Sequence, residues 1–225
     1  MFVKICANTN LEDARLAAEL GADAVGFVFA ESKRRVNAEQ VAAITRELPA
    51  ELIKVGVFTS TDPDEILRTA KTAGLNAVQL HSDFDPDLVD AIVSGSKGML
   101  SVLQVIDVPE GAMLEDLESE LRVTVEHPYI EAVLLDASHG GASGGTGKTF
   151  DWDATAMLVR RVAIETGGRV IVAGGLRAGN VGEAINAFRP WGVDVASGVE
   201  ATPGKKDAAK LREFIAAVRA FTQVG

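Results

Sequence analysis

The sequence has little cysteine, a shortage of basic residues and no long apolar run, and each shortage argues against a class of protein. Its single cysteine, Cys6, excludes an intramolecular disulfide. The 22 Lys and Arg are outnumbered by 32 Asp and Glu, and the net charge of −10 argues against binding to nucleic-acid phosphates. No apolar run approaches the ~18 residues that cross a bilayer, and Lys4 interrupts the apolar N-terminal stretch early. We therefore expect a cytoplasmic protein that binds neither nucleic acid nor membrane.

What the chain does have is an apolar content of 47% with 24% charged residues, which is typical of a globular protein. Short apolar runs alternate with helical segments from end to end. The runs are rich in Val, Ile, Leu and Phe, as expected of parallel strands that are covered on both faces. The predicted strands are Phe2–Cys6, Ala24–Phe29, Leu52–Phe58, Ala77–His81, Leu100–Ile106, Ile130–Asp136, Arg169–Ala173 and Gly192–Ser197.

Helices are predicted between these strands, and several have legible starts. Asp62-Pro63 and Asp85-Pro86 each place a capping carboxylate before a proline at the first helical position. A long acidic helix is expected over Glu110–Glu126, and the last helix over about Asp207–Thr222. Eight βα units of ~28 residues fill the chain, which favours a closed (β/α)8 TIM barrel of the α/β class over an open doubly wound sheet. We predict one domain, residues 1–225.

Polar residues on the apolar strands are informative, because a barrel gathers its chemistry at the C-terminal ends of its strands. Strand alternation turns the polar residues toward the barrel axis if the β-branched residues pack under the helices. The inward set is Lys4, Cys6, Gln79, His81, Asp136 and Asp194. Cys6, His81 and Asp136 then lie at the upper rim, and such a convergence of titratable groups is what acid–base chemistry requires.

Each of these residues also has a purely structural interpretation. A lone cysteine is more often an inert buried residue than a catalyst, and His81 could simply cap a strand end. Asp136 directly follows an apolar run, so it must be solvated or paired, and a functional role is favoured. For Asp194, which lies deeper, the structural interpretation is an ion pair with Lys4 or another basic group.

Glycines gather where the last two strands give way to helices. Gly174 and Gly175 follow the seventh strand, and Ser197 and Gly198 follow the eighth. Glycine lets backbone N–H groups approach an anion closely, and a helix start adds a favourable dipole. The loops after strands seven and eight are where barrels commonly hold a phosphate. The sequence therefore predicts a phosphate site at these loops.

A third glycine cluster, residues 144–148, follows the sixth strand. The spacing of glycines before Lys148 does not complete a Walker loop. One interpretation is a mobile surface loop. The other is a lid that folds over a bound ligand and lends the amides of Gly145 and Gly147 to the phosphate.

Taken together, these motifs resemble the phosphoribosylanthranilate isomerase family. The resemblance runs from residue 3 to about residue 218, in the order of the family. In the first half it rests on Val3–Cys6, Gly21–Phe29, Ser32–Arg34 and Val78–His81. In the second half it rests on Leu134–Asp136, Gly144–Trp152, Ala173–Leu176, Asn180-Val181, Asp194–Glu200 and Pro203–Asp207.

The resemblance implies an Amadori rearrangement in tryptophan biosynthesis. N-(5-phosphoribosyl)anthranilate becomes 1-(2-carboxyphenylamino)-1-deoxyribulose 5-phosphate without a metal or an organic cofactor. Asp136 matches the general acid that protonates the ribose ring oxygen, and Cys6 matches the general base that removes the C2 proton. The base must be a thiolate, which a neighbouring cation such as Lys4 or Arg34 would promote.

The resemblance also assigns binding residues. Arg34 matches the position that holds the anthranilate moiety, Asp194 matches one that positions substrate hydroxyls, and we count His81 among the substrate contacts. The expected phosphate-binding residues are Gly145, Gly147, Gly174, Gly175, Ser197 and Gly198. Two positions depart from the family pattern: Ala7 and Ser82 stand where glycine is usual. A β-carbon at Ala7 could crowd the ligand or restrict the backbone.

Three alternatives remain open on the sequence. The related aminoaldose isomerase of histidine biosynthesis is expected to have Asp in place of Cys6. A catalytically silent relative that binds a sugar phosphate is kept open by Ala7 and Ser82. A lyase-type barrel would need a catalytic Lys and Glu pair on early strands, which we do not find. A monomer and a homodimer are both compatible with the sequence.

Overall fold

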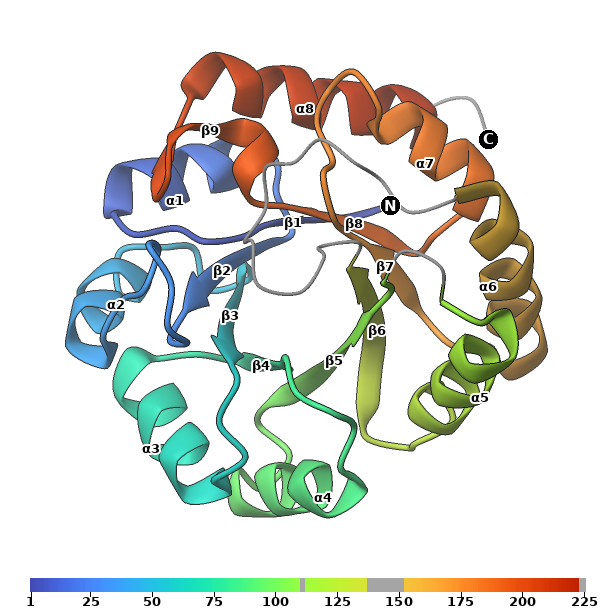
Figure 1. Ribbon diagram of the computed structural model, residues 1–225. Coiled ribbons are helices and arrows are strands. Elements are labelled where there is room, and N and C mark those ends of the chain that lie inside the picture. Colours follow the sequence, from blue (N-terminus) through green and yellow to red (C-terminus); the bar gives the residue numbers. More distant parts are fainter. Residues whose placement is uncertain (110–111, 137–151, 223–225) are drawn as a thin grey trace.

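The computed structural model describes residues 1–109, 112–136 and 152–222. Strands β1 to β8 are parallel and close into a barrel in sequence order, and helices surround the barrel (Figure 1). The barrel strands are β1 (Phe2–Ile5), β2 (Ala24–Val28), β3 (Ile53–Phe58), β4 (Ala77–Leu80), β5 (Ser101–Asp107), β6 (Ile130–Asp136), β7 (Val170–Val172) and β8 (Gly192–Val195). Each predicted strand is present with ends shifted by at most two residues, and the predicted (β/α)8 barrel is confirmed.

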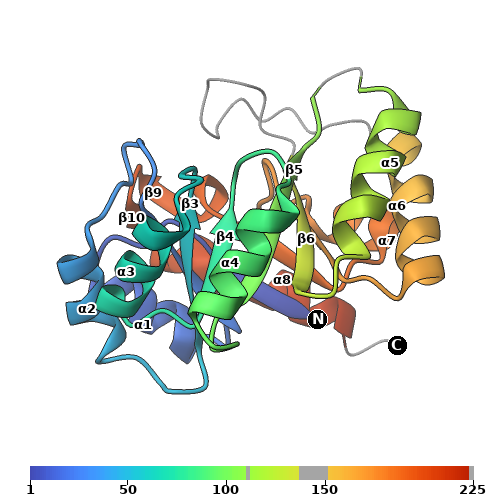
Figure 2. The ribbon, with the colours of Figure 1, turned by 90° about the horizontal axis from the view of Figure 1, so that it is seen from below.

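The helices lie on the outer side of the strands, as Figure 2 shows for α3, α4 and α5. They are α1 (Leu11–Glu19), α2 (Ala38–Thr45), α3 (Pro63–Ala73), α4 (Pro86–Gly95), α5 (Leu114–Val125), α6 (Trp152–Thr166), α7 (Val181–Phe188) and α8 (Ala208–Thr222). The predicted starts of α3 and α4 are confirmed, because Asp62 and Asp85 each accept two backbone hydrogen bonds from the first turn. In the described ranges, no helix has the length and apolarity needed to cross a membrane.

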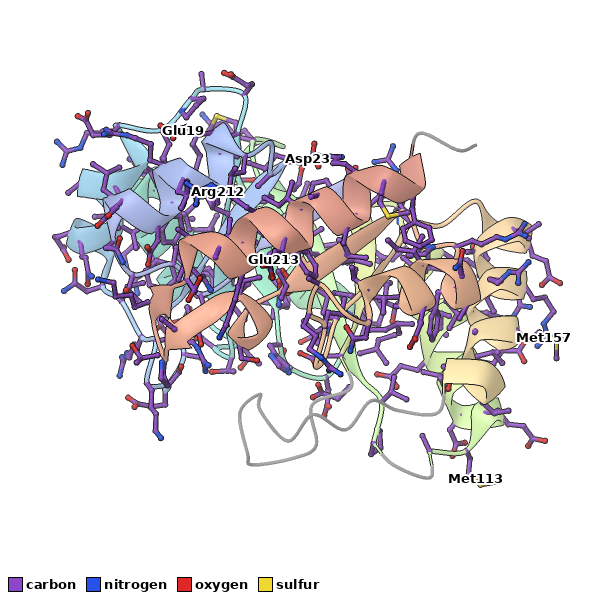
Figure 3. The ribbon with its side chains drawn as sticks, turned by 90° about the horizontal axis from the view of Figure 1, so that it is seen from above. Glu19, Asp23, Met113, Met157, Arg212 and Glu213 are labelled. Atoms are coloured by element: carbon purple, nitrogen blue, oxygen red, sulfur yellow. The ribbon has the colours of Figure 1, made fainter. Side chains whose placement is uncertain are left out.

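The prediction for α5 is wrong at its start. The helix begins at Leu114, whereas Ala112 donates a turn hydrogen bond to the carbonyl of Pro109. Residues 110 and 111 lie outside the described residues. The N-cap Met113 has no side-chain hydrogen bond to offer the helix and is 65% exposed. Figure 3 shows it at the outer surface, as it does Met157 of α6.

The barrel divides the core into two layers, and this division orients the polar residues. The outer layer, between strands and helices, contains Val3, Ile5, Val133, Leu135, Val193 and Val195. The inner layer, on the barrel axis, contains Ala24, Val55, Ala77, Leu103, Val105, Ala132, Leu134, Ile171 and Ala173. On β1, β6 and β8 the β-branched residues therefore face the helices, as predicted, and their polar neighbours face the axis.

The first strand closes the barrel by pairing with both β2 and β8. In this register Lys4 lies opposite Ala24 on one side and Asp194 on the other. At the end where the strands begin, the rings of Phe2 and Trp191 stack with their centroids 4.5 Å apart. The seam of the barrel is therefore sealed by apolar contact below and carries charged side chains above.

A short antiparallel hairpin that the sequence analysis did not predict follows β8. It consists of β9 (Glu200–Thr202) and β10 (Lys205–Lys206), joined at Gly204, whose φ is +82°. A Pro-Gly pair is a strong turn signal, so Pro203-Gly204 could have revealed it. Thr9 Oγ1 donates a hydrogen bond to the Gly204 carbonyl, which fixes the hairpin against the loop that follows β1.

Candidate functional site

A cavity of about 320 Å³ opens at the C-terminal ends of the barrel strands. It brings together most of the residues that the sequence predicts for the site. These are Cys6, Arg34, His81, Asp136, Gly174, Gly175, Asp194, Ser197 and Gly198. The two other predicted phosphate ligands, Gly145 and Gly147, lie outside the described residues.

A larger hollow of about 600 Å³ lies at the opposite end of the barrel, around α6, α7 and Trp191. Its titratable lining residues are the arginines Arg160, Arg169 and Arg189. Arginine stays protonated in proteins, so these side chains cannot exchange a proton near neutral pH. Acid–base chemistry is therefore assigned to the smaller cavity.

Lys4 and Asp194 form a buried ion pair at the floor of the cavity. The Lys4 Nζ lies 2.8 Å from Asp194 Oδ1, and the Lys4 side chain is fully buried. Burial penalises the lysine charge, but the Asp194 carboxylate and the Cys6 sulfur outweigh that penalty and raise the pKa of Lys4. The cation is therefore permanent, and the structural interpretation of Asp194 is confirmed while its carboxylate also borders the cavity.

The thiol of Cys6 is buried beside this pair. Burial raises the pKa of the thiol, and the nearby charge of Lys4 opposes that rise without overcoming it. Without a ligand, the protonated thiol is thus favoured. The cation that the sequence analysis expected is present in Lys4, but its effect is smaller than the cost of burying a thiolate.

Because Gly26 has no side chain, the Cys6 side chain has room to lie against it. A β-carbon at this position of β2 would lie 2.7 Å from Cys6 Sγ and 3.1 Å from its Cα. Real Cβ atoms do not approach other atoms so closely, so a side chain here must move Cys6. Glycine at residue 26 is therefore required by the position of the thiol.

We expect Gly26→Ala to misplace Cys6 and to lower both stability and turnover. Overpacking of this kind costs ~1–3 kcal/mol of unfolding free energy, measurable by urea denaturation. A displacement of the sulfur by about 1 Å is expected to reduce kcat by roughly 100-fold. Gly179→Ala is the matched control, because its β-carbon would meet no atom within 4 Å and its φ is not positive. Equal kcat in the two variants would contradict this role for Gly26.

Ala7 adopts a left-handed backbone conformation directly after Cys6. Its φ is +60° and its side chain is buried. A residue with a β-carbon pays ~1–2 kcal/mol for this conformation, whereas glycine adopts it freely. Ala7 therefore adopts this conformation at a cost, and the geometry explains why glycine suits this position.

Arg34 forms a bidentate ion pair with Glu200 at the rim of the cavity. Its Nε and Nη2 lie 2.8 and 2.7 Å from the two carboxylate oxygens. Burial alone would raise the pKa of Glu200, but hydrogen bonds from Arg34 and the charge of Lys206 hold it below its ordinary value. Sequence reasoning missed Glu200 and Lys206 as site residues, although both lie in motifs that it singled out.

His81, at the end of β4, is hydrogen-bonded to Asp107 at the end of β5. The His81 Nε2 lies 3.1 Å from Asp107 Oδ1. This hydrogen bond is the main reason that the pKa of His81 is raised, and the charge of Asp136 adds to the effect. Because the folded pKa exceeds the ordinary value, the pair stabilises the fold at low pH and that stabilisation is lost as pH rises through the folded pKa.

We expect Asp107→Asn to lower the pKa of His81, because the main interaction that stabilises the imidazolium is removed while its partial burial remains. A pH titration of the ring resonances by NMR measures the shift, with His81→Gln assigning the signal among three histidines. Asp64→Asn, on α3, removes the same charge outside this contact. A His81 pKa unchanged by Asp107→Asn but lowered by Asp64→Asn would show that the hydrogen bond is not the cause.

Asp136 ends β6 and lies opposite Asp107 in the sheet register. Its backbone carbonyl accepts a hydrogen bond from Val108, with 2.8 Å between N and O. Its carboxylate borders the same cavity as Cys6, which β1 presents from another part of the barrel. The glycine cluster that one interpretation makes a lid, residues 144–148, lies outside the described residues.

The glycine loops after β7 and β8 meet with almost no space between their backbones. Gly174 and Gly175 have φ values of +87° and +62°, and a β-carbon on Gly198 would lie 1.8 Å from the Leu176 carbonyl oxygen. Asn180 fixes the first loop by donating to the Gly175 carbonyl at 3.0 Å. Among the described residues, the backbone N–H group of Gly175 donates no hydrogen bond.

Comparison with known proteins shows that the similarity covers almost the whole chain. The family model for N-(5'-phosphoribosyl)anthranilate isomerase matches residues 3–217. The protein of that name from Pelobacter propionicus is 44% identical over 95% of this chain and 93% of its own length. Its counterpart from Rubrobacter xylanophilus is 41% identical, with coverage of 96% and 98%.

Solved structures agree with these matches. The phosphoribosyl anthranilate isomerase of Thermotoga maritima superposes with a TM-score of 0.83 at 38% identity, covering 98% of this chain and 99% of that one. Another solved isomerase, in complex with reduced 1-(o-carboxyphenylamino)-1-deoxyribulose 5-phosphate, superposes with a TM-score of 0.80 at 37% identity, again with coverage of 98% and 99%. By sequence and by fold, this chain belongs to the N-(5'-phosphoribosyl)anthranilate isomerase family.

Proposed function

We propose that this chain rearranges N-(5'-phosphoribosyl)anthranilate to 1-(o-carboxyphenylamino)-1-deoxyribulose 5-phosphate, with Cys6 as the general base and Asp136 as the general acid. The chain is an isomerase of tryptophan biosynthesis, as its family membership gives. The observation that carries the residue roles is one cavity in which a thiol, a carboxyl group and two glycine loops border the same space.

Opening the ribose ring needs a proton donor, and Asp136 is proposed to supply it. As the ring oxygen leaves C1, it gains negative charge, and a positioned acid lowers the barrier by protonating it. The nitrogen lone pair of the anthranilate then forms a Schiff base with C1. Asp136 suits this role because it is half-buried at the end of β6, with its carboxyl group on the cavity.

The second step removes the proton from C2, and Cys6 is proposed to accept it. The resulting enolamine tautomerises to the ketone of the product. A thiolate is needed, and the charge of Lys4 is the largest effect that favours it. Lys4 is therefore proposed to stabilise the thiolate while Asp194 holds Lys4 in place and binds substrate hydroxyls.

The glycine loops after β7 and β8 are proposed to bind the substrate phosphate. The unpaired backbone N–H of Gly175 borders the cavity together with Gly198, and backbone N–H groups in glycine loops suit an anion. The cradle is preformed, because the close contact between Gly198 and Leu176 fixes one loop against the other. Gly174 and Ser197 complete it.

Arg34 and His81 are proposed to recognise the anthranilate moiety. The ion pair with Glu200 uses Nε and Nη2 of Arg34 and holds the guanidinium in one orientation. Its other N–H groups stay available to a ligand. His81, whose pKa is raised by Asp107, is a second basic group on this cavity. Two basic side chains that border one cavity suit a ligand with a carboxylate.

Turnover of N-(5'-phosphoribosyl)anthranilate tests the proposed function directly. The substrate is fluorescent, so the purified protein is expected to make the signal fall as product forms. Binding of the reduced product analogue without turnover would support a silent sugar-phosphate binder instead. If the protein showed no turnover and no binding of the analogue, the assignment would be contradicted altogether.

The remaining expectations are proposals about the setting of this activity. The ligand is a small phosphorylated molecule, as in the solved relative that holds a phosphorylated product analogue. We propose that the protein is cytoplasmic, works as one domain without a cofactor, and is a monomer or a homodimer. Sedimentation measured over a range of protein concentrations distinguishes the two assemblies.

A further inference from the structure

Lys206 takes no part in the proposed reaction steps, yet it holds the backbone of the proposed base. Burial lowers the pKa of this lysine, and the nearby charge of Glu200 opposes that fall. The Lys206 Nζ lies 2.6 Å from the carbonyl oxygen of Cys6 and 3.2 Å from that of Ala196. The side chain is fully buried, so these oxygens replace the water that an ammonium group otherwise requires. Lys206 therefore joins the end of β1 to the end of β8.

The hairpin of β9 and β10 fixes Lys206 in this place. The Lys206 backbone N–H donates to Asp13 Oδ2 at 2.8 Å, which ties β10 to the first turn of α1. The Glu200 carboxylate lies 3.5 Å from Nζ and balances its charge. The Lys206 backbone is thus fixed by Asp13, and its ammonium group contacts Glu200 and the carbonyls of Cys6 and Ala196.

The oxygen that Lys206 holds belongs to the peptide bond that precedes Ala7. Rotation of this peptide plane changes φ of Ala7 and ψ of Cys6 together. Ala7 has a φ of +60°, which a residue with a β-carbon rarely adopts. On the other side, the Asn8 backbone N–H donates to the Gly26 carbonyl at 2.8 Å. A disfavoured conformation is therefore enclosed between two fixed hydrogen bonds.

We propose that Lys206 is a positioning residue that keeps the Cys6–Ala7 peptide in the orientation that directs the Cys6 thiol into the cavity. This role rests on the proposed function, in which Cys6 is the base. Without the lysine, Ala7 relaxes toward an ordinary negative φ, and the turn that carries Cys6 shifts together with its thiol. Glycine at residue 7 has no such tendency, because it adopts a positive φ freely.

A double-mutant cycle tests the proposal, with kcat measured for Lys206→Met, Ala7→Gly and the two combined. We expect Lys206→Met to lower kcat about tenfold or more, with a smaller change in KM. In the Ala7→Gly background, Lys206→Met is expected to lower kcat less than about threefold. Lys210→Met is the control. Its Nζ donates to the Glu200 carbonyl from the following helix, so it removes a nearby cation that does not hold Cys6.

The pKa of Cys6 gives a second readout that a purely structural role would not move. Since the chain has one cysteine, the pH dependence of its alkylation by iodoacetamide reports this group alone. Loss of the Lys206 charge is expected to raise the thiol pKa in both backgrounds, whereas kcat recovers only with Ala7→Gly. Equal losses of kcat in both backgrounds would mean that Lys206 acts through its charge, and the positioning role would be wrong.

Folding of each variant is checked by circular dichroism and urea unfolding. If Lys206→Met unfolds the chain and Ala7→Gly restores the fold, the coupling between the two residues is supported; unfolding in both backgrounds contradicts it. Failure of the proposed function looks different. The unaltered chain would then show no turnover, whereas failure of the Lys206 role alone leaves an active enzyme with equal losses in the two backgrounds.

Discussion

Cys6→Ser is expected to lower kcat about a thousandfold while binding of the reduced product analogue changes little. Serine has nearly the shape of cysteine, so the contact with Gly26 and the bonds of the Cys6 backbone are preserved. Its hydroxyl, however, is a far weaker acid than a thiol and supplies almost no anion near neutral pH. General base catalysis contributes ~10²–10⁴ to a rate, and this substitution removes that contribution.

Steady-state kinetics and a fluorescence titration with the analogue separate the two effects. A mutation that removes a group needed only for proton transfer lowers kcat without weakening binding. Gly179→Ala, prepared in parallel, controls for the handling of variants. Full activity in Cys6→Ser would show that another group is the base, even if the reaction is right.

Asp136→Asn is expected to lower kcat by a similar factor, roughly 10²–10⁴, because an amide has no acidic proton to transfer. The substitution keeps the size of the side chain and its place at the end of β6. The Schiff base must then form without protonation of the departing ring oxygen. Single-turnover measurements are expected to show the loss in the chemical step and not in product release.

Asp107→Asn is the matched control for this change. Asp107 lies directly opposite Asp136 in the sheet, so its replacement removes the same charge from the same rim without removing the proposed acid. We expect the loss of kcat to be at least about tenfold smaller than for Asp136→Asn. Equal losses would indicate that negative charge at the rim matters, and that Asp136 is not the proton donor.

The strands and the inward-facing polar residues could be predicted from the sequence because both follow from local patterns. Apolar runs of the right length mark the strands, and alternation within a run decides which side chains face the axis. Cys6, Asp136 and Asp194 were placed on one cavity in this way, and the cavity does contain them. The starts of α3 and α4 were also predictable, since Asp-Pro is a local capping signal.

Contacts between residues far apart in the chain could not be predicted in the same way. Arg34 and Glu200 are separated by 166 positions, and no periodicity in either segment points to the other. The start of α5 was misplaced for a related reason, since acidic residues favour a first turn but do not determine where it begins. The balance of charges around Cys6 was equally hidden, because it depends on burial that only the assembled barrel creates.

The hydrogen bond between Lys206 and Cys6 also has a consequence for synthesis on the ribosome. Its partners are 200 positions apart, so the thiol is made early and its last neighbour late. At ~5–20 residues per second, about 10–40 s pass between them. The contacts that position Cys6 can therefore form only after nearly the whole chain has been made.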